Sequence, residues 1–213
     1  MKFTRRDTLI LAASASIAST LGLGSAQAQE GTTKDVNALA NVAIPDIVEG
    51  SPDAKVTVIE YASPTCPHCA AFALNVYPAF KAEYVDTGKV KFILRPFIRN
   101  LQDAVVFLLA YSAGEEKFHQ VVDTFFQTQG TWGLAEKPRA ALLEVAKQLG
   151  FTEESFDKAL ADQDLFEKMK TMQEQASNEF KLEGTPTFYV NGKQLTGDKS
   201  LEELKAVIDP LLG

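Results

Sequence analysis

The chain has 213 residues, of which 46% are apolar and 23% charged, which is ordinary for one folded domain with a hydrophobic core. Its formal net charge of −7 argues against a surface that binds nucleic acid. A chain of this length also needs no disulfide scaffold to fold.

Residues 1–28 have the three parts of an export signal. Lys2, Arg5 and Arg6 form a basic end, Leu9–Leu23 an apolar centre, and residues 26–28 a small-residue cleavage site. The alternative, a retained membrane helix, needs about 20 strongly apolar residues, whereas serine, threonine and glycine interrupt this run. We therefore predict a cleaved signal peptide and a periplasmic protein. The paired arginines resemble a twin-arginine (Tat) signal, but threonine replaces the usual phenylalanine, so Sec export stays open.

Residues 29–53 form a polar N-terminal extension, with a short helix within 30–40 and no separate domain. The segment that follows, bounded by Pro52 and Pro64, is rich in β-branched residues. This composition predicts a buried strand over 55–63.

A helix is predicted next, from Cys69 to about Val85, because apolar residues recur there at helical spacing. Pro78 lies inside this pattern and predicts a kink. A second strand is expected over 89–97, and residues of about 101–182 show only helical patterns. They are interpreted as a helical insertion.

An Asn-Gly pair at 191–192 between two short strands is a strong hairpin signal, and an amphipathic helix over Leu201–Leu212 ends the chain. Within the insertion, His119 is expected on a helix surface without a role. Trp132 is interpreted either as a core aromatic or as the lining of a groove for unfolded substrate.

Both cysteines of the chain lie in Cys66-Pro67-His68-Cys69, where the first predicted strand turns into a helix. A purely structural disulfide is weakly supported, since closing a loop of four residues is worth only about 2 kcal/mol. Cys66, His68 and Cys69 could together hold Cu(I) or Zn(II). A closed zinc site takes four ligands, however, and His119 and three methionines are the remaining soft candidates.

A redox centre explains more of the local residues. A thiolate at Cys66 would lie at a helix N-terminus, where free N–H groups and the helix dipole favour negative charge. The imidazole of His68 can add a positive neighbour. Both effects should lower the pKa of Cys66, so that the Cys66–Cys69 disulfide becomes a strong oxidant.

The strand that contains Glu60, the Cys-Pro-His-Cys motif, the helical insertion and the "GTPTF" before the hairpin together resemble the DsbA family of exported thiol:disulfide interchange proteins. The resemblance covers about residues 54–213. It implies an α/β thioredoxin fold with a helical insertion between the second strand and a cis-proline hairpin.

The resemblance also implies roles for individual residues. Thr185-Pro186 matches the cis-proline loop that offers main-chain groups to an extended substrate. Glu60 matches the buried acid beneath the site, which should have a raised pKa and could exchange a proton with Cys69. The alternative for Glu60 is a surface position at a sheet edge. Cys69 matches the buried partner cysteine.

The implied activity is that of an enzyme, a protein thiol:disulfide oxidoreductase that donates its disulfide to reduced cysteines of exported proteins. The redox-active disulfide requires no organic cofactor, and a membrane partner that passes electrons to a quinone would reoxidise it. A disulfide isomerase or reductase of the same fold is the first alternative, because isomerase relatives carry threonine where this chain has Thr185. A periplasmic copper- or zinc-binding protein is the second. After removal of residues 1–28, only about 25 residues precede the first predicted strand, too few for the oligomerisation segment of an isomerase, so a monomer is expected.

Overall fold

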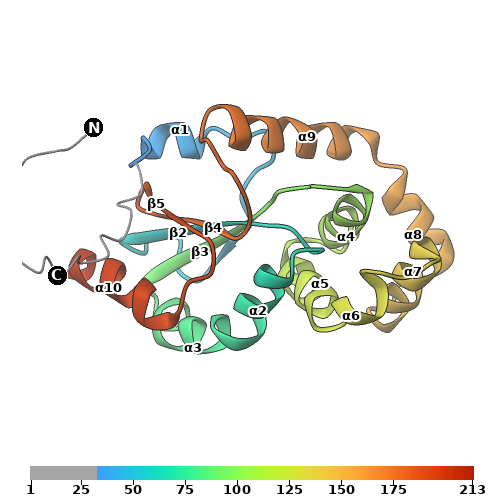
Figure 1. The fold of residues 1–213 in the computed structure, drawn as a ribbon, viewed down its shortest axis with the longest axis horizontal. Helices are drawn as coiled ribbons and strands as arrows, with labels where there is room; N and C mark the ends of the chain where they lie inside the picture. The colour runs from blue at the N-terminus through green and yellow to red at the C-terminus, as the bar shows by residue number, and fades with distance from the viewer. Residues whose placement is uncertain (1–32) are drawn as a thin grey trace, which may run out of the picture. The chain divides into compact units, whose positions relative to one another are not determined.

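The computed structural model describes residues 33–213, and the predicted signal peptide lies outside them. Its centre is a five-stranded sheet in the order β1-β3-β2-β4-β5 (Figure 1). The strands are β1 (Val48–Glu49), β2 (Val56–Ala62), β3 (Val90–Pro96), β4 (Thr187–Val190) and β5 (Lys193–Thr196). β2 and β3 are parallel, and the other neighbouring pairs are antiparallel. The central strand β2 is rich in β-branched and aromatic residues and is almost entirely buried, as its sequence predicts.

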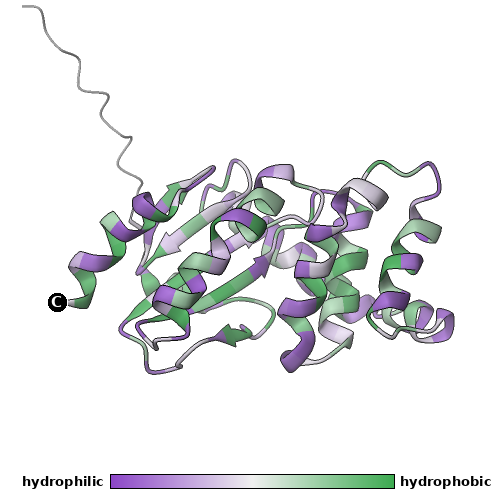
Figure 2. Ribbon diagram, turned by 90° about the horizontal axis from the view of Figure 1, so that it is seen from below, coloured by the Kyte–Doolittle hydropathy of each residue, from purple (hydrophilic) through white to green (hydrophobic). Residues whose placement is uncertain are grey.

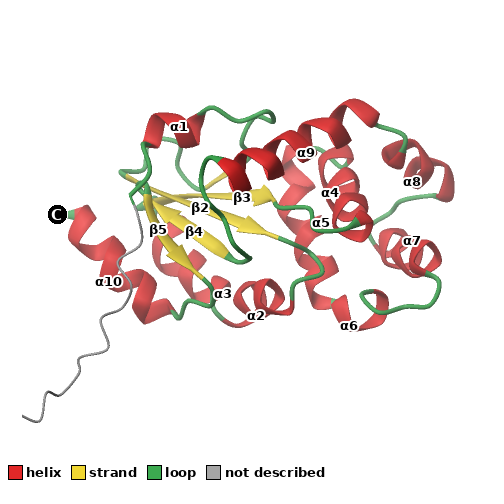
Figure 3. Ribbon diagram, turned by 45° about the horizontal axis from the view of Figure 1, so that its top comes forward, coloured by secondary structure: helices red, strands yellow, loops and turns green. Residues whose placement is uncertain are grey.

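The helices follow the predicted order. They are α1 (Val36–Ala40), α2 (Pro67–Asn75), α3 (Tyr77–Phe80), the π-helical turn η1 (Lys81–Val85), α4 (Leu101–Ser112), α5 (Glu115–Gln127), α6 (Gln129–Trp132), α7 (Pro138–Gln148), α8 (Glu153–Leu160), α9 (Gln163–Asn178) and α10 (Leu201–Leu212). In Figure 1, α1 and α9 lie above the sheet, and α2, α3 and α10 lie below it. Helices α4–α8 gather at one end of the sheet (Figure 3).

The two faces of the sheet have separate hydrophobic cores. Because side chains alternate along a strand, Val58 and Phe92 point into the larger core on the side of α2. Ile59, Tyr61 and Tyr189 belong to the smaller core, to which α1 and α9 also contribute. Figure 2 shows the apolar segments of strands and helices turned toward one another, with polar residues outside.

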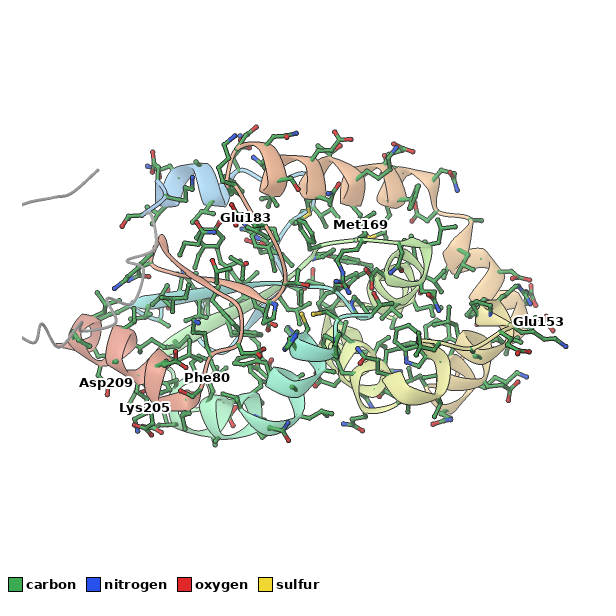
Figure 4. All side chains as sticks on the ribbon, viewed as in Figure 1. Phe80, Glu153, Met169, Glu183, Lys205 and Asp209 are labelled. Carbon is green, nitrogen blue, oxygen red and sulfur yellow. The ribbon has the colours of Figure 1, made fainter. Side chains whose placement is uncertain are left out.

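The predicted helix from Cys69 to Val85 is divided into three pieces. It begins earlier, at Pro67, and is interrupted at Val76. Pro78 has no N–H group to continue the hydrogen-bond ladder, which explains a break just before it. Figure 4 shows Lys205 and Asp209 of α10 near Phe80, and Asp209 accepts a hydrogen bond from the hydroxyl of Tyr84 at 2.6 Å. The last helix therefore holds the end of this broken helix in place.

Trp132 is a core residue of the insertion. Its side chain is fully buried, and Nε1 donates to the carbonyl of Phe125 at 2.9 Å. The groove interpretation of Trp132 is therefore wrong, because a fully buried indole cannot contact a substrate.

The strand β1 is absent from the sequence-based prediction. Its two residues pair with Ile93 and Phe92 of β3. A strand of two residues is too short to leave an alternating pattern, so the sequence shows only a polar segment there. Residues before β2 thus extend the sheet.

Candidate active site

The two cysteines lie at the start of α2, directly after the loop that follows β2. Cys66 is the N-cap residue and Cys69 belongs to the first turn. Both are buried free thiols. Pro67 occupies a first-turn position, where its missing N–H costs no helical hydrogen bond. The helix therefore begins at the reactive sulfur, as the sequence predicts.

The Thr185-Pro186 segment meets Cys66 across 119 residues of chain. The peptide bond between Thr185 and Pro186 is cis. Cys66 Sγ lies 3.2 Å from the Thr185 carbonyl oxygen, to which the thiol donates when it is protonated. The Thr185 hydroxyl is buried and has no hydrogen-bond partner among the described residues. The structure therefore brings together the motif and the loop that the sequence analysis treats as one site.

The acidity of Cys66 is strongly increased. Its pKa falls to about 5, and the largest cause is a hydrogen bond with the Cys69 thiol. Burial opposes this effect, while the backbone N–H groups of Cys69 and His68 add to it. Free N–H groups at a helix start are the expected source of such stabilisation. At neutral pH, Cys66 is a thiolate.

The imidazole of His68 lies against another partner. Its Nδ1 is 2.7 Å from Oδ2 of Asp198, and both side chains are exposed. His68 acts on Cys66 through its backbone N–H group. The predicted contribution of the imidazole charge to the thiolate stays a prediction.

The pKa values of Cys69 and Glu60 are raised, whereas that of Cys66 is lowered. Burial raises the pKa of Cys69 well above its ordinary value, and Cys66 and Glu60 raise it further. The pKa of Glu60 is also raised, first by burial and then by the charges of Asp123 and Cys66. Glu60 lies in the centre of β2, between β3 and β4. The surface alternative for Glu60 is therefore wrong, because β2 is a central strand.

A buried carboxylate, Asp103 in α4, organises the loop before the cysteines. It accepts hydrogen bonds from Ser63 Oγ at 2.8 Å, from Thr65 N at 2.7 Å and from Arg99 N at 2.9 Å. Sequence analysis missed this residue. The available signal is a lone acid near the start of a strongly apolar helix, where an unpaired charge would be costly.

The insertion also reaches the cysteine loop directly. Gln129 Nε2 donates to the carbonyl oxygens of Pro64 at 2.7 Å and of Cys66 at 3.1 Å. Gln129 is the first residue of α6, in a glycine-containing segment. Its amide holds the backbone on both sides of Thr65.

His119 is mostly buried, so its expected surface position is wrong. Its Nδ1 lies 3.4 Å from Oε2 of Glu49, and the His119 side chain is only 17% exposed. The ring packs near Phe92 and Phe118. The error follows from missing β1, which carries Glu49 to this helix.

Within residues 33–213, no group of three or more His, Cys, Asp and Glu side chains is arranged to hold a metal ion. In the same part of the chain, no helix combines the length and the apolar character that a membrane span requires.

A family model described as thioredoxin matches residues 43–210. A protein of Rickettsia bellii named "Putative protein-disulfide oxidoreductase" is 35% identical over 165 residues, which are 77% of this chain and 63% of that protein. A Bacillus anthracis protein named "Probable disulfide bond formation protein D" is 32% identical over 171 residues, 75% of each chain. The chain thus spans about three fifths of the length of the Rickettsia relative.

A solved structure gives the same result. The crystal structure of alpha-DsbA1 from Wolbachia pipientis superposes with a TM-score of 0.77 at 26% identity, covering 83% of this chain and 96% of that chain. The predicted fold class, a thioredoxin fold with a helical insertion, is confirmed, and the named relatives favour redox chemistry over metal binding. The chain belongs to the thioredoxin family and, within it, to the DsbA-like proteins.

Proposed function

We propose that this protein is a thiol:disulfide oxidoreductase that donates the Cys66–Cys69 disulfide to reduced cysteines of exported proteins. The observation that carries the proposal is the opposite acidity of the two thiols. The pKa of Cys66 falls to about 5, whereas that of Cys69 is raised. A stabilised thiolate at Cys66 favours the reduced form, and such a disulfide is a strong oxidant.

The reaction begins when a substrate thiolate attacks Cys66 Sγ. A bond forms between the substrate sulfur and Cys66, the Cys66–Cys69 bond breaks, and the sulfur of Cys69 leaves with the electron pair and takes up a proton. A second substrate thiolate then attacks the substrate sulfur of this mixed disulfide. The substrate is oxidised by two electrons, and Cys66 leaves as a thiolate.

The surrounding residues have distinct proposed roles. Pro67 and the backbone N–H groups at the helix start keep Cys66 in the thiolate form, with His68 beside them. Glu60 exchanges a proton with Cys69, to which it is electrostatically coupled. Thr185 and Pro186 present main-chain groups to the substrate next to Cys66. The chemistry requires no organic cofactor.

The export, the domain boundaries, the redox partner and the oligomeric state of this protein belong to the same proposal. We infer export by the signal in residues 1–28, a domain over 54–213 that carries the chemistry, and a membrane partner that reoxidises the cysteines. The expected state is a monomer. The names of the relatives, which include a disulfide bond formation protein, support a role in oxidising other proteins.

An isomerase or reductase of the same fold is the second candidate, and Thr185 before Pro186 is the residue that favours it. Equilibration of the purified protein with a glutathione redox buffer separates the two. An oxidase should remain reduced until the buffer is strongly oxidising. A potential near that of thioredoxin, about −270 mV, contradicts the oxidase proposal.

Thiolate absorbance as a function of pH tests whether a lowered pKa of Cys66 makes the disulfide a strong oxidant. As the pH is lowered, the thiolate absorbance of the reduced protein should fall with a midpoint near the Cys66 pKa of about 5. A midpoint at the ordinary thiol value of about 8.5 would remove the basis of the oxidant assignment.

A further inference from the structure

The helical insertion bonds the main chain of the reactive cysteine itself. Nε2 of Gln129 donates to the carbonyl oxygen of Cys66 at 3.1 Å and to that of Pro64 at 2.7 Å. A primary amide carries two N–H donors, which these two acceptors can occupy. The carbonyl of Cys66 also accepts the first hydrogen bond of α2, from Ala70 N at 3.1 Å. Gln129 therefore bonds the residue at which the helix and the reactive sulfur meet.

The packing of the insertion fixes the place of Gln129. Gln129 begins α6, a single turn that ends at the fully buried Trp132. The indole N–H of Trp132 donates to the carbonyl of Phe125 in α5 at 2.9 Å. The side-chain amide of Gln102 in α4 donates to the carbonyls of Trp132 and Gly133 at 3.3 and 3.4 Å. A Cβ added at Gly133 would lie only 2.9 Å from the carbonyl oxygen of Gln129. Gln129 therefore has little room to move relative to α4 and α5.

The position of Cys66 decides how well its thiolate is stabilised. The backbone N–H groups of His68 and Cys69 favour the thiolate, as donors at a helix start do, provided that Sγ stays close to them. The carbonyl oxygen of Thr185, 3.2 Å from Sγ, repels the sulfur once its proton is gone. A movement of Sγ away from the helix start therefore disfavours the thiolate.

Gln129 acts on this balance in two ways. Because it bonds the carbonyls before and after Thr65, it restricts rotation of the Cys66 backbone. Its amide hydrogen also offsets part of the negative charge on the Cys66 carbonyl oxygen, which would otherwise repel the thiolate of the same residue. Both effects stabilise the thiolate and hence the reduced protein.

The charged and titratable groups around Cys66 come from other positions in the chain. Gln129 is neutral, so its replacement by another neutral side chain changes no charge near the sulfur. The groups that stay in place are Cys69, Glu60, the His68–Asp198 pair, and Asp103 and Arg99, which both bond Thr65.

We propose that Gln129 is a positioning residue through which the helical insertion makes the Cys66–Cys69 disulfide a stronger oxidant. The inference rests on the proposed function and deepens it, because it gives the insertion a share in setting the redox equilibrium. Gln129 acts through the main chain of Cys66.

Gln129→Leu keeps most of the size of the side chain and removes both donors. In the reduced variant, the midpoint of thiolate absorbance against pH should rise by about one pH unit. The reduced form is then less stabilised at pH 7. The equilibrium constant with which the protein oxidises reduced glutathione should therefore fall about tenfold.

Gln127→Leu is the matched control, since it makes the same change at an exposed glutamine two residues earlier. It should change neither the midpoint nor the equilibrium constant. Gly133→Ala perturbs the same contact without removing the amide, because the added methyl group must displace Gln129. It should raise the midpoint by a smaller amount than Gln129→Leu does.

Urea unfolding of the oxidised and reduced forms separates positioning from a structural role. A structural role lowers the stability of both forms equally and leaves the midpoint at its wild-type value. That result for Gln129→Leu, or an equal rise of the midpoint in Gln127→Leu, overturns the inference and leaves the proposed function intact. If Gln129→Leu does not fold, an unchanged midpoint in Gly133→Ala overturns it. A wild-type midpoint at about 8.5, the ordinary thiol value, overturns both the inference and the proposed function.

Discussion

The two faces of the central sheet each bury one ionisable side chain, and the two differ in their hydrogen bonding. On the α1 side, Arg95 forms a bidentate pair with Asp46 at 2.7 Å for both bonds and also donates to Leu39 O at 2.7 Å and to Tyr61 OH at 3.0 Å. On the α2 side, Glu60 has an oxygen without a partner among residues 33–213.

The difference is the one expected between a structural buried group and a group that exchanges protons, the role proposed for Glu60. Four of the five N–H groups of the Arg95 guanidinium donate hydrogen bonds, so Arg95 fastens residues of the N-terminal segment to the sheet. Glu60 keeps an unsatisfied oxygen and a raised pKa, which is the usual state of a group that exchanges protons. Four predictions test this contrast, in order of decreasing effect.

Asp46→Ala should lower the free energy of unfolding by about 3 to 5 kcal/mol, because it leaves the Arg95 charge buried and unpaired. Urea unfolding measures the loss. Asp157→Ala is the control, since Asp157 pairs with Arg139 at the surface, and its loss should stay under about 1 kcal/mol. Equal losses in the two variants would show that Arg95 is not a structural anchor.

Cys66→Ser should destabilise the reduced protein by roughly 2 to 3 kcal/mol near pH 7, since the thiolate of the wild type is lost. The folded pKa of Cys66 is lowered to about 5, so its stabilisation is complete above the unfolded value of about 8.5 and disappears as the pH falls through 5. Unfolding of the variant and the reduced wild type at several pH values measures the difference. The oxidised wild type, which has no thiolate, should lack this pH dependence. A difference that is constant with pH would contradict the prediction.

Glu60→Leu should raise the free energy of unfolding by about 1 to 2 kcal/mol at pH 8, because it removes an unsatisfied buried carboxyl. The raised folded pKa means that the wild type loses stability as the pH rises from the unfolded value of about 4.3 toward the folded one. The gain should therefore be smaller at pH 4 than at pH 8. Comparison with Glu60→Gln, which removes only the charge, isolates the pH-dependent part. A less stable Glu60→Leu protein would assign Glu60 a structural role like that of Arg95.

Asp198→Ala should have the smallest effect, under about 1 kcal/mol, because exposed ion pairs contribute little. Asp198 and His68 are 62% and 63% exposed. The same variant removes the partner of the His68 imidazole. Thiolate absorbance of this variant then shows whether the charge of the imidazole changes the pKa of Cys66. A loss comparable to that of Asp46→Ala would mean that this pair anchors the start of α2.

Local patterns explain why so much of the site was predictable. The strand before Cys66, the helix after it, the hairpin at 191–192 and the final helix each carry a periodic or turn signal within a few residues. The family resemblance added Glu60 and Thr185-Pro186, which no local signal connects to the cysteines.

Residues that act through distant partners escaped prediction. Asp103 and Gln129 lie on helices of the insertion, and each holds the cysteine loop by a hydrogen bond to a group from another part of the chain. Asp103 carries a weak local signal, as the lone acid of an apolar helix, whereas nothing within α6 distinguishes Gln129 from an ordinary polar residue. His119 was misplaced for the same reason, since its burial depends on β1.

The sequence by itself determined the order of the strands other than β1, the position of the cysteine pair at a helix start and the chemistry that two such thiols can perform, because these depend on residue type and short-range spacing. The tertiary structure alone decided that Arg95 is fully paired whereas Glu60 has an oxygen without a partner among residues 33–213, and that Thr185 faces Cys66. Hydrogen bonding, burial and electrostatic coupling at those places arise only when segments far apart in the chain pack together.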